Sequence, residues 1–291
     1  MTFSPKGRPD RDIMNNNKAF QPDIYLERIH HCGQAPLSEA GLADLHRAQV
    51  CTIPFENFDI LLGHGISLAY GDIFDKLVRN NRGGYCFELN GLFLMALQAF
   101  GFDVRPILAR VHRSGIPMGR GHQISLVNLL GRAWITDVGF GSPHMPCPLP
   151  LEINRVATHN NESFQFVEAE PYGIMLQTLQ KDRWQDLYSF DLGHVCPGDI
   201  VYGNHYTSTH PNSFFTFSRV AALATQSGRI TLFNHTLKQL ITGIEHVQEL
   251  PEGPIYLQAL KDHFGIDLNV PYGALPPLQP ENTEKMRSIG F

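Results

Sequence analysis

The stretch RGGYCFELNGLF, residues 82–93, places a cysteine directly behind two glycines and at the front of a helix-forming run. Gly83 and Gly84 allow a close backbone approach and positive φ values, so the chain can turn sharply into the helix. A thiol in the first helical turn faces unpaired N–H groups and the positive end of the helix dipole, and both favour its thiolate form. Cys86 is therefore a candidate nucleophile, although its position alone also fits an ordinary buried cysteine.

The residues on the two sides of this stretch follow different patterns. Residues 22–82 carry apolar side chains three and four apart, which predicts helices, one of them starting at Ser38 and Glu39. Cys86 opens an amphipathic helix that is expected to close at Gly101. Residues 103–192 form short segments rich in Val, Ile, Phe and Tyr, separated by Gly, Pro or Asn, which predicts an antiparallel barrel or sandwich. A second β segment within 210–240 and a closing helix over 253–266 complete a chain of the α+β class.

A thiol nucleophile also needs a base, and the base needs an orienting acid. His122 stands out among the 14 histidines because it follows the glycine-rich MGRG, residues 118–121, and opens the strand HQISLV. The next strand leads into DVGFG, which begins with Asp137. With a two-residue hairpin loop at 130–131 or 131–132, Asp137 lies opposite Ile124 or Leu126. Both are an even number of residues from His122, so the side chains of His122 and Asp137 point from the same face of the sheet. The hairpin therefore permits a His122–Asp137 contact beside Cys86.

The composition argues against several classes of partner. The chain has 291 residues, 43% of them hydrophobic, and a net charge of −5 without any Lys/Arg-rich run, so we expect neither nucleic acid nor a membrane as its partner. No apolar run reaches about 18 residues, and the N-terminus lacks the apolar core of a signal peptide, which indicates a cytoplasmic protein. Its five scattered cysteines are expected to be thiols.

Two further motifs have a structural explanation. The sequence HHCG, residues 30–33, lacks a second motif at metal-ligand spacing, so we expect no metal there or elsewhere. Glu56 in PFEN could be catalytic, but a structural hydrogen bond or ion pair is the better explanation of a single acidic residue in this setting.

Five segments, in this order and spacing, resemble the arylamine N-acetyltransferase family, in particular its bacterial members of the N-hydroxyarylamine O-acetyltransferase type. Along the chain they are IPFENFDI (53–60), RGGYCFELN (82–90), GHQISLV (121–127), ITDVGFG (135–141) and NHYTSTHPNSFF (204–215). The resemblance runs from about Pro22 to beyond Lys261. It implies a helical bundle over 21–101 that carries the nucleophile, a central antiparallel β-barrel over 102–200 and an α/β lid over 201–291, while the Asn-, Pro- and Arg-rich residues 1–20 are expected to form a loose leader. The core of such a fold is similar to that of cysteine proteases.

The resemblance also implies roles for single residues. Cys86 would accept the acetyl group, His122 would act as general base and acid, and Asp137 would hold the imidazole. Six more positions match the family's substrate sites, with the acceptor pocket at Phe55, Phe140 and Gly141 and the CoA contacts at Gly121, Tyr206 and Asn212. Met118 and Asn212 stand where related chains often have Thr, and the leader is longer than expected.

The implied activity is a ping-pong transfer of acetyl from acetyl-CoA, through a thioester on Cys86, to arylamines, arylhydrazines or N-hydroxyarylamines, as in xenobiotic metabolism. A thiol amidase or peptidase would use the same three residues, because such triads recur on unrelated folds. A ligand-binding protein that kept the pocket and an amide synthase that closes a ring remain alternatives. The sequence does not indicate an oligomeric state.

Overall fold

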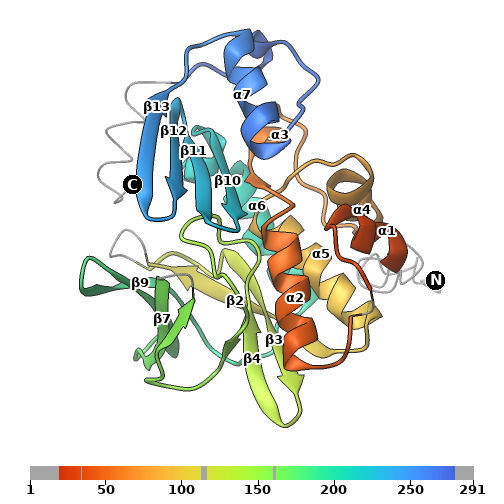
Figure 1. Ribbon diagram of the computed structural model, residues 1–291, viewed down its shortest axis with the longest axis vertical. Helices are drawn as coiled ribbons and strands as arrows, with labels where there is room; N and C mark the ends of the chain where they lie inside the picture. The colour runs from red at the N-terminus through yellow and green to blue at the C-terminus, as the bar shows by residue number, and fades with distance from the viewer. Residues whose placement is uncertain (1–19, 34, 113–116, 160–161, 279–291) are drawn as a thin grey trace, which may run out of the picture.

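The computed structural model describes residues 20–33, 35–112, 117–159 and 162–278. The expected leader, apart from Phe20, lies outside these residues. Three groups of elements follow one another along the chain (Figure 1): helices, a large sheet, and a smaller sheet with two helices. In the described ranges, no helix is long and apolar enough to span a bilayer.

The N-terminal part is helical, as the spacing of its apolar residues predicts. Ser38 caps one helix, since its side chain accepts a hydrogen bond from the N–H of Gly41 at 3.1 Å. The one strand here, β1 (Phe55–Glu56), was not predicted. The helices are α1 (Pro22–Arg28), α2 (Glu39–Val50), α3 (Phe58–Leu61), α4 (Tyr70–Phe74) with a π-helical continuation (Asp75–Arg79), and α5 (Cys86–Ala99).

Helix α5 begins at Cys86, as predicted, but it is not amphipathic. Every residue from Cys86 to Leu97 is buried, so the helix has no solvent-facing polar side and lies in the middle of the molecule (Figure 1). The two glycines before it do not have positive φ values, so the expectation that they were needed for such a backbone is wrong. A Cβ on Gly83 would lie 2.3 Å from the carbonyl oxygen of Pro54, so this glycine serves the close backbone approach alone.

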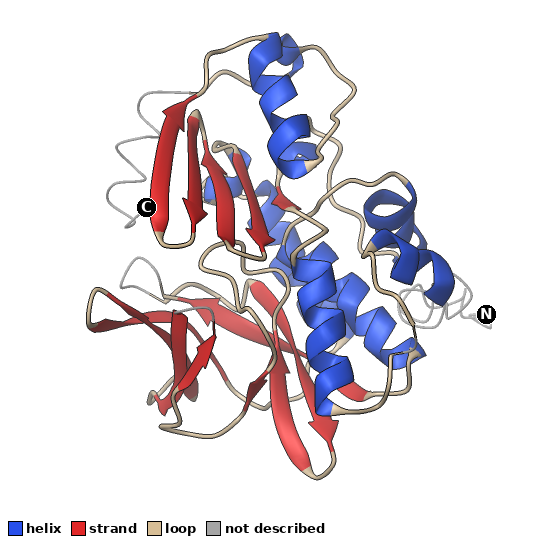
Figure 2. Ribbon diagram, viewed as in Figure 1, coloured by secondary structure: helices blue, strands red, loops and turns tan. Residues whose placement is uncertain are grey.

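The central part is an eight-stranded antiparallel sheet in the order β5-β4-β3-β2-β9-β8-β7-β6, which curls into a nearly closed barrel (Figure 2). Its hairpin between β3 and β4 has the loop Leu130–Gly131, one of the two predicted, because Leu129 pairs with Arg132. The strands are β2 (Asp103–Val111), β3 (His122–Leu129), β4 (Arg132–Thr136), β5 (Leu149–Pro150), β6 (Ala157–His159), β7 (Glu162–Glu168), β8 (Ile174–Gln180) and β9 (Arg183–Phe190).

The C-terminal part holds the second β segment and the closing helix that the sequence predicts, together with a helix that it missed. That helix is α6 (Pro197–Thr209), followed by a 3₁₀ turn (Phe214–Thr216). The sheet has the order β1-β10-β11-β12-β13, so β1 from the helical part forms its edge. The remaining elements are β10 (Val220–Thr225), β11 (Gly228–Phe233), β12 (Thr236–Ile241), β13 (Ile244–Glu249), α7 (Pro254–Phe264) and a 3₁₀ turn (Tyr272–Ala274).

The β3–β4 loop yields a stability prediction. Leu130 has a φ of 52° and Gly131 a φ of 77°, the left-handed pair of a two-residue hairpin turn, and Leu130 is 77% exposed. Asn tolerates this backbone better than Leu and no buried contact is lost. Leu130→Asn should therefore raise the free energy of unfolding by about 0.5–1 kcal/mol in urea titrations. Leu37→Asn, at an exposed site outside the left-handed region, should give no such gain.

Candidate active site

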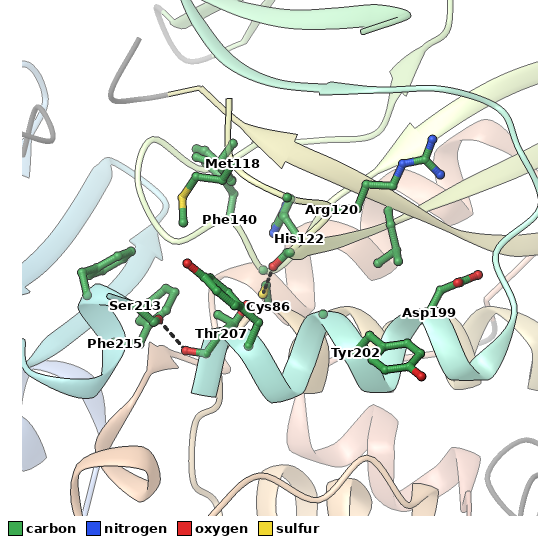
Figure 3. Close-up of a pocket in the computed structure, with 18 of the residues that line it drawn as sticks. Cys86, Met118, Arg120, His122, Phe140, Asp199, Tyr202, Thr207, Ser213 and Phe215 are labelled. Atoms are coloured by element: carbon green, nitrogen blue, oxygen red, sulfur yellow. Dashed lines mark hydrogen bonds between the residues drawn. The ribbon is translucent and has the colours of Figure 1, made fainter. Parts of the chain in front are cut away.

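A cavity of about 630 Å³ lies where the three parts of the chain meet, and Cys86 and His122 both line it (Figure 3). Its walls come from the start of α5, the edge of the barrel and helix α6. Aromatic side chains surround the two polar residues, among them Phe55, Phe140 and Phe215. The cavity therefore combines a thiol and an imidazole with walls suited to a flat apolar ligand.

Cys86 is the first residue of α5 and is only 4% exposed. Its Sγ lies 3.8 Å from the carbonyl oxygen of Gly121, the residue before His122. The start of the helix is fixed by Glu88, whose Oε2 accepts a hydrogen bond from the backbone N–H of Tyr85 at 3.1 Å. The sulfur thus sits at the positive end of the helix dipole, where negative charge is favoured.

A network of buried and half-buried charges lies directly behind this helix start. Lys76 donates to Glu88 at 2.7 Å and pairs with Asp59 at 2.7 Å, while Arg82 donates to Glu56 at 2.8 and 3.0 Å. Glu56 also accepts a hydrogen bond from the N–H of Phe58 at 2.9 Å, so it has the structural contacts expected of it. The network ties β1 and the π-helical turn to the two glycines before Cys86.

His122 and Asp137 form a short hydrogen bond, with Nε2 and Oδ2 2.7 Å apart and both residues buried. Burial alone lowers the pKa of His122, but the carboxylate of Asp137 and the neighbouring Cys86 outweigh this and raise the pKa to about 10. Burial would raise the pKa of Asp137, yet His122, Asn90 and the N–H of Gly139 hold it below its usual value. The pair is therefore an imidazolium and a carboxylate at neutral pH.

The main chain around Asp137 is held by two helices. Asn90 of α5 donates to Oδ1 of Asp137 at 3.0 Å and accepts from the N–H of Val138 at 3.0 Å. His46 of α2 lies 3.2 Å from the carbonyl oxygen of Asp137. Sequence reasoning missed both residues. For Asn90 a signal existed, because a residue four positions after Cys86 lies on the same helix face.

Gly139, in the predicted motif DVGFG, permits the close approach of this turn to Cys86. A Cβ on Gly139 would lie 3.0 Å from the Cα of Cys86 and 2.7 Å from Nδ2 of Asn90. Any side chain here would push the Asp137 turn away from α5. The glycine thus sets the distance between the acid and the helix that carries the thiol.

The other predicted site residues divide into two groups. Phe55, Phe140, Gly121, Tyr206 and Asn212 all line the cavity. Gly141 is not among the lining residues in the described part of the chain, but a Cβ on it would lie 3.5 Å from the ring of Phe55. Around His122, the rings of Phe140 and Tyr188 each pack at 5.2 Å between centroids.

Helix α6 forms a wall of the cavity that sequence reasoning missed. Asp199, Tyr202, Gly203 and Thr207 line it from one face of the helix, beside Tyr206. The helix packs closely, since a Cβ on Gly203 would lie 3.0 Å from the Arg120 carbonyl oxygen and 2.8 Å from the Phe87 ring. The proline at its first position and the acidic Asp199 in its first turn favour a helix start here. Its two glycines and its β-branched residues have low helix propensity, so the sequence does not predict a helix.

The chain is similar in sequence to proteins of known function. A family model described as N-acetyltransferase matches residues 40–272. The chain is 35% identical over 251 residues to the arylamine N-acetyltransferase / N-hydroxyarylamine O-acetyltransferase of Salmonella typhimurium, covering 84% of this chain and 88% of that protein. It is 34% identical to the arylamine N-acetyltransferase of Escherichia coli, with the same coverage of 84% and 88%.

Solved structures give the same result. The arylamine N-acetyltransferase from Salmonella typhimurium superimposes with a TM-score of 0.82 at 32% identity, covering 92% of this chain and 98% of that one. The Mycobacterium marinum arylamine N-acetyltransferase in complex with CoA superimposes with a TM-score of 0.82 at 31% identity, covering 88% and 97%. The fold is that of an acyltransferase. The chain belongs to the arylamine N-acetyltransferase family.

The buried pair predicts a pH-dependent contribution to stability. His122 stabilises the fold in full below its ordinary pKa of 6.5, and this contribution is lost as the pH rises to about 10. The depressed pKa of Asp137 adds stability above 3.8 that is lost on acidification. Asp137→Asn should therefore lower the unfolding free energy by about 3–5 kcal/mol near pH 6. This loss should shrink towards pH 10 in urea titrations.

The exposed Asp103→Asn is the control, since its small effect should not change over the same range. A deficit in Asp137→Asn that grows between pH 6 and pH 10 would contradict the assigned charge state.

Proposed function

We propose that Cys86, His122 and Asp137 form a catalytic triad that transfers acetyl from acetyl-CoA to an arylamine, arylhydrazine or N-hydroxyarylamine by a ping-pong mechanism. The observation that carries the proposal is the hydrogen bond between His122 and Asp137, 2.7 Å long, at a cavity that both His122 and Cys86 line. This arrangement supplies a nucleophile, a base and an orienting acid in one place.

In the first half-reaction the Cys86 thiolate, paired with the His122 imidazolium, attacks the thioester carbonyl of acetyl-CoA. The tetrahedral oxyanion forms beside the start of α5, where free backbone N–H groups favour negative charge. CoA leaves as its thiol, with the proton supplied by His122, and an acetyl thioester remains on Cys86. His122 is then neutral and ready to act as a base.

In the second half-reaction the amine attacks the acetyl thioester of Cys86. His122 removes the proton that the amine nitrogen loses, and the cysteine leaves as a thiolate beside the regenerated imidazolium. Asp137 keeps the ring oriented in both steps and stabilises its charged form. The product amide or ester leaves before the next acetyl-CoA binds, which gives ping-pong kinetics.

The cavity walls support an aromatic acceptor. Phe55, Phe140 and Phe215 would enclose a flat ring, with Gly141 letting the ring of Phe55 pack behind it. We place the CoA moiety along Gly121, Tyr206 and Asn212, which line the same cavity. The Mycobacterium marinum relative in complex with CoA supports this choice of donor.

We also propose the functional division of the chain predicted from its sequence. Residues 21–101 would carry the nucleophile, residues 102–200 the base and the acid, and residues 201–291 a lid, on a core similar to that of cysteine proteases. In support, α6 lies across the cavity from His122 (Figure 3). The cytoplasmic location and the absence of a metal stay predictions.

Intact-protein mass spectrometry after mixing with acetyl-CoA tests the reaction class. The protein should gain one acetyl group within the first turnover and lose it when an arylamine is added. Cys86→Ser should gain none, because a hydroxyl beside the imidazolium is a far weaker nucleophile than a thiolate.

Two further measurements, of acetate release and of the Cys86→Ala variant, separate the alternatives. Acetate released at one rate with and without amine would indicate a thiol hydrolase, and unchanged function in Cys86→Ala would indicate a binding protein. No adduct on the unmodified protein would refute the proposed mechanism.

The aromatic wall gives a prediction about the acceptor. Phe215→Leu removes a ring that packs 5.9 Å from Phe55. The rate at which an arylamine deacetylates Cys86 should fall by about 3- to 10-fold, the value of one aromatic contact. Acetylation by acetyl-CoA, measured by mass in the same samples, should stay within about 2-fold. Equal losses in the two half-reactions would count against an acceptor role for this wall.

A further inference from the structure

A buried histidine outside the cavity contacts the triad acid through its main chain. His46 of α2 is fully buried, and its Nε2 lies 3.2 Å from the carbonyl oxygen of Asp137. Its Nδ1 has no hydrogen-bond partner among the described residues. The ring packs edge-on against Phe93 of α5 at 5.7 Å between centroids. A polar ring is thus buried with a single hydrogen bond, which Asp137 receives.

We propose that His46 is a positioning residue for the transfer reaction, whose Nε2–H holds the Asp137 carbonyl so that the carboxylate stays aimed at His122. The inference rests on the proposed function of the Cys86, His122 and Asp137 triad. His46 touches neither substrate in this scheme and acts through Asp137.

The direction of the hydrogen bond fixes the state of the ring. A carbonyl oxygen can only accept, so the proton must be on Nε2 of His46. Burial lowers the pKa of His46 to about 3, against the opposing effect of Asp137 and with smaller contributions from His144 and Arg47. The ring is therefore neutral at working pH and keeps one tautomer, so it is a constant donor rather than a switch.

Two helices hold the same peptide unit from opposite sides. The carbonyl of Asp137 and the N–H of Val138 belong to one planar trans peptide and point in opposite directions. His46 of α2 binds the carbonyl, and Asn90 of α5 accepts the N–H at 3.0 Å. The peptide cannot rotate without breaking one of these bonds. Its orientation determines where the Asp137 side chain begins.

The next residue transmits any rotation of this peptide to the thiol. The N–H of Gly139 donates to Oδ1 of Asp137 at 2.9 Å, and its Cα lies against Cys86 with no room for a side chain. Loss of the His46 bond would therefore disturb the carboxylate and its spacing from α5 together. A displacement of about 1 Å is enough to cost roughly 100-fold in rate.

Two amide substitutions separate positioning from packing. His46→Gln places its amide nitrogen near the position of Nε2, whereas the shorter His46→Asn reaches only the position of Nδ1. Both bury an amide in the same pocket, so they share most of the packing cost. Phe93→Leu is the control that loosens the packing of the ring without removing the hydrogen bond.

The readouts are the rate of Cys86 acetylation by acetyl-CoA, the pH profile of its alkylation by iodoacetamide, and the melting temperature. His46→Asn should acetylate about 10- to 100-fold more slowly, and its alkylation should need a higher pH than in the unmodified protein. His46→Gln should stay within about 3-fold with an unchanged profile. The groups that face His122 and also shape this profile are Asp137, Cys86 and Tyr188, and none is altered.

Two outcomes would overturn the proposal: equal effects of the two amides, or a profile that Phe93→Leu shifts as much as His46→Asn does. If His46→Asn does not fold, slow acetylation by a folded His46→Gln would likewise overturn the proposal. Alkylation does not depend on acetyl transfer. If the unmodified protein takes up no acetyl group while its alkylation profile still depends on His46, the proposed function fails. The inference that His46 positions Asp137 beside His122 would still stand.

Discussion

The hydrogen bond between His122 and Asp137 is the constraint around which this molecule is built. A buried imidazolium and a buried carboxylate are each costly, and they are tolerated because each has the other as a partner and the carboxylate accepts further hydrogen bonds. The second carboxylate oxygen is satisfied by Asn90 and by the turn at Gly139. Helices α2 and α5 and the β3–β4 hairpin must therefore assemble in one arrangement for the pair to exist.

The same constraint explains the ionic network on the other side of Cys86. The ion pairs of Lys76 and Arg82 hold the two glycines and the first turn of α5 on one side of the Cys86 sulfur. Gly139 packs against Cys86 on the other side. From Cys86 to Leu97, the helix between these two supports is buried on every side. Packing around these residues therefore holds the Cys86 sulfur in place.

Local chemistry made part of this structure predictable from the sequence. The Ser38 cap, the start of α5 and the hairpin loop depend on neighbouring residues, and the alternation of side chains along strands then placed His122 and Asp137 on one face. The rest depends on contacts between distant segments. No local pattern indicates that β1 joins the C-terminal sheet or that His46 meets the Asp137 carbonyl. Helix α6 was missed because a propensity scale counts its two glycines against a helix, although one of them, Gly203, serves close packing.

Helix α6 has a consequence for how ligands and stability are linked. Its Gly203 packs against Phe87 and Arg120. The cavity's walls come from segments more than 100 residues apart in the chain, such as Phe55 and Tyr206. The cavity is therefore a property of the assembled chain, and no single segment could form it by itself. A molecule that occupies it binds only the assembled state, so occupancy shifts the folding equilibrium by mass action, and the concentration of such a ligand becomes one of the factors that keep this enzyme folded.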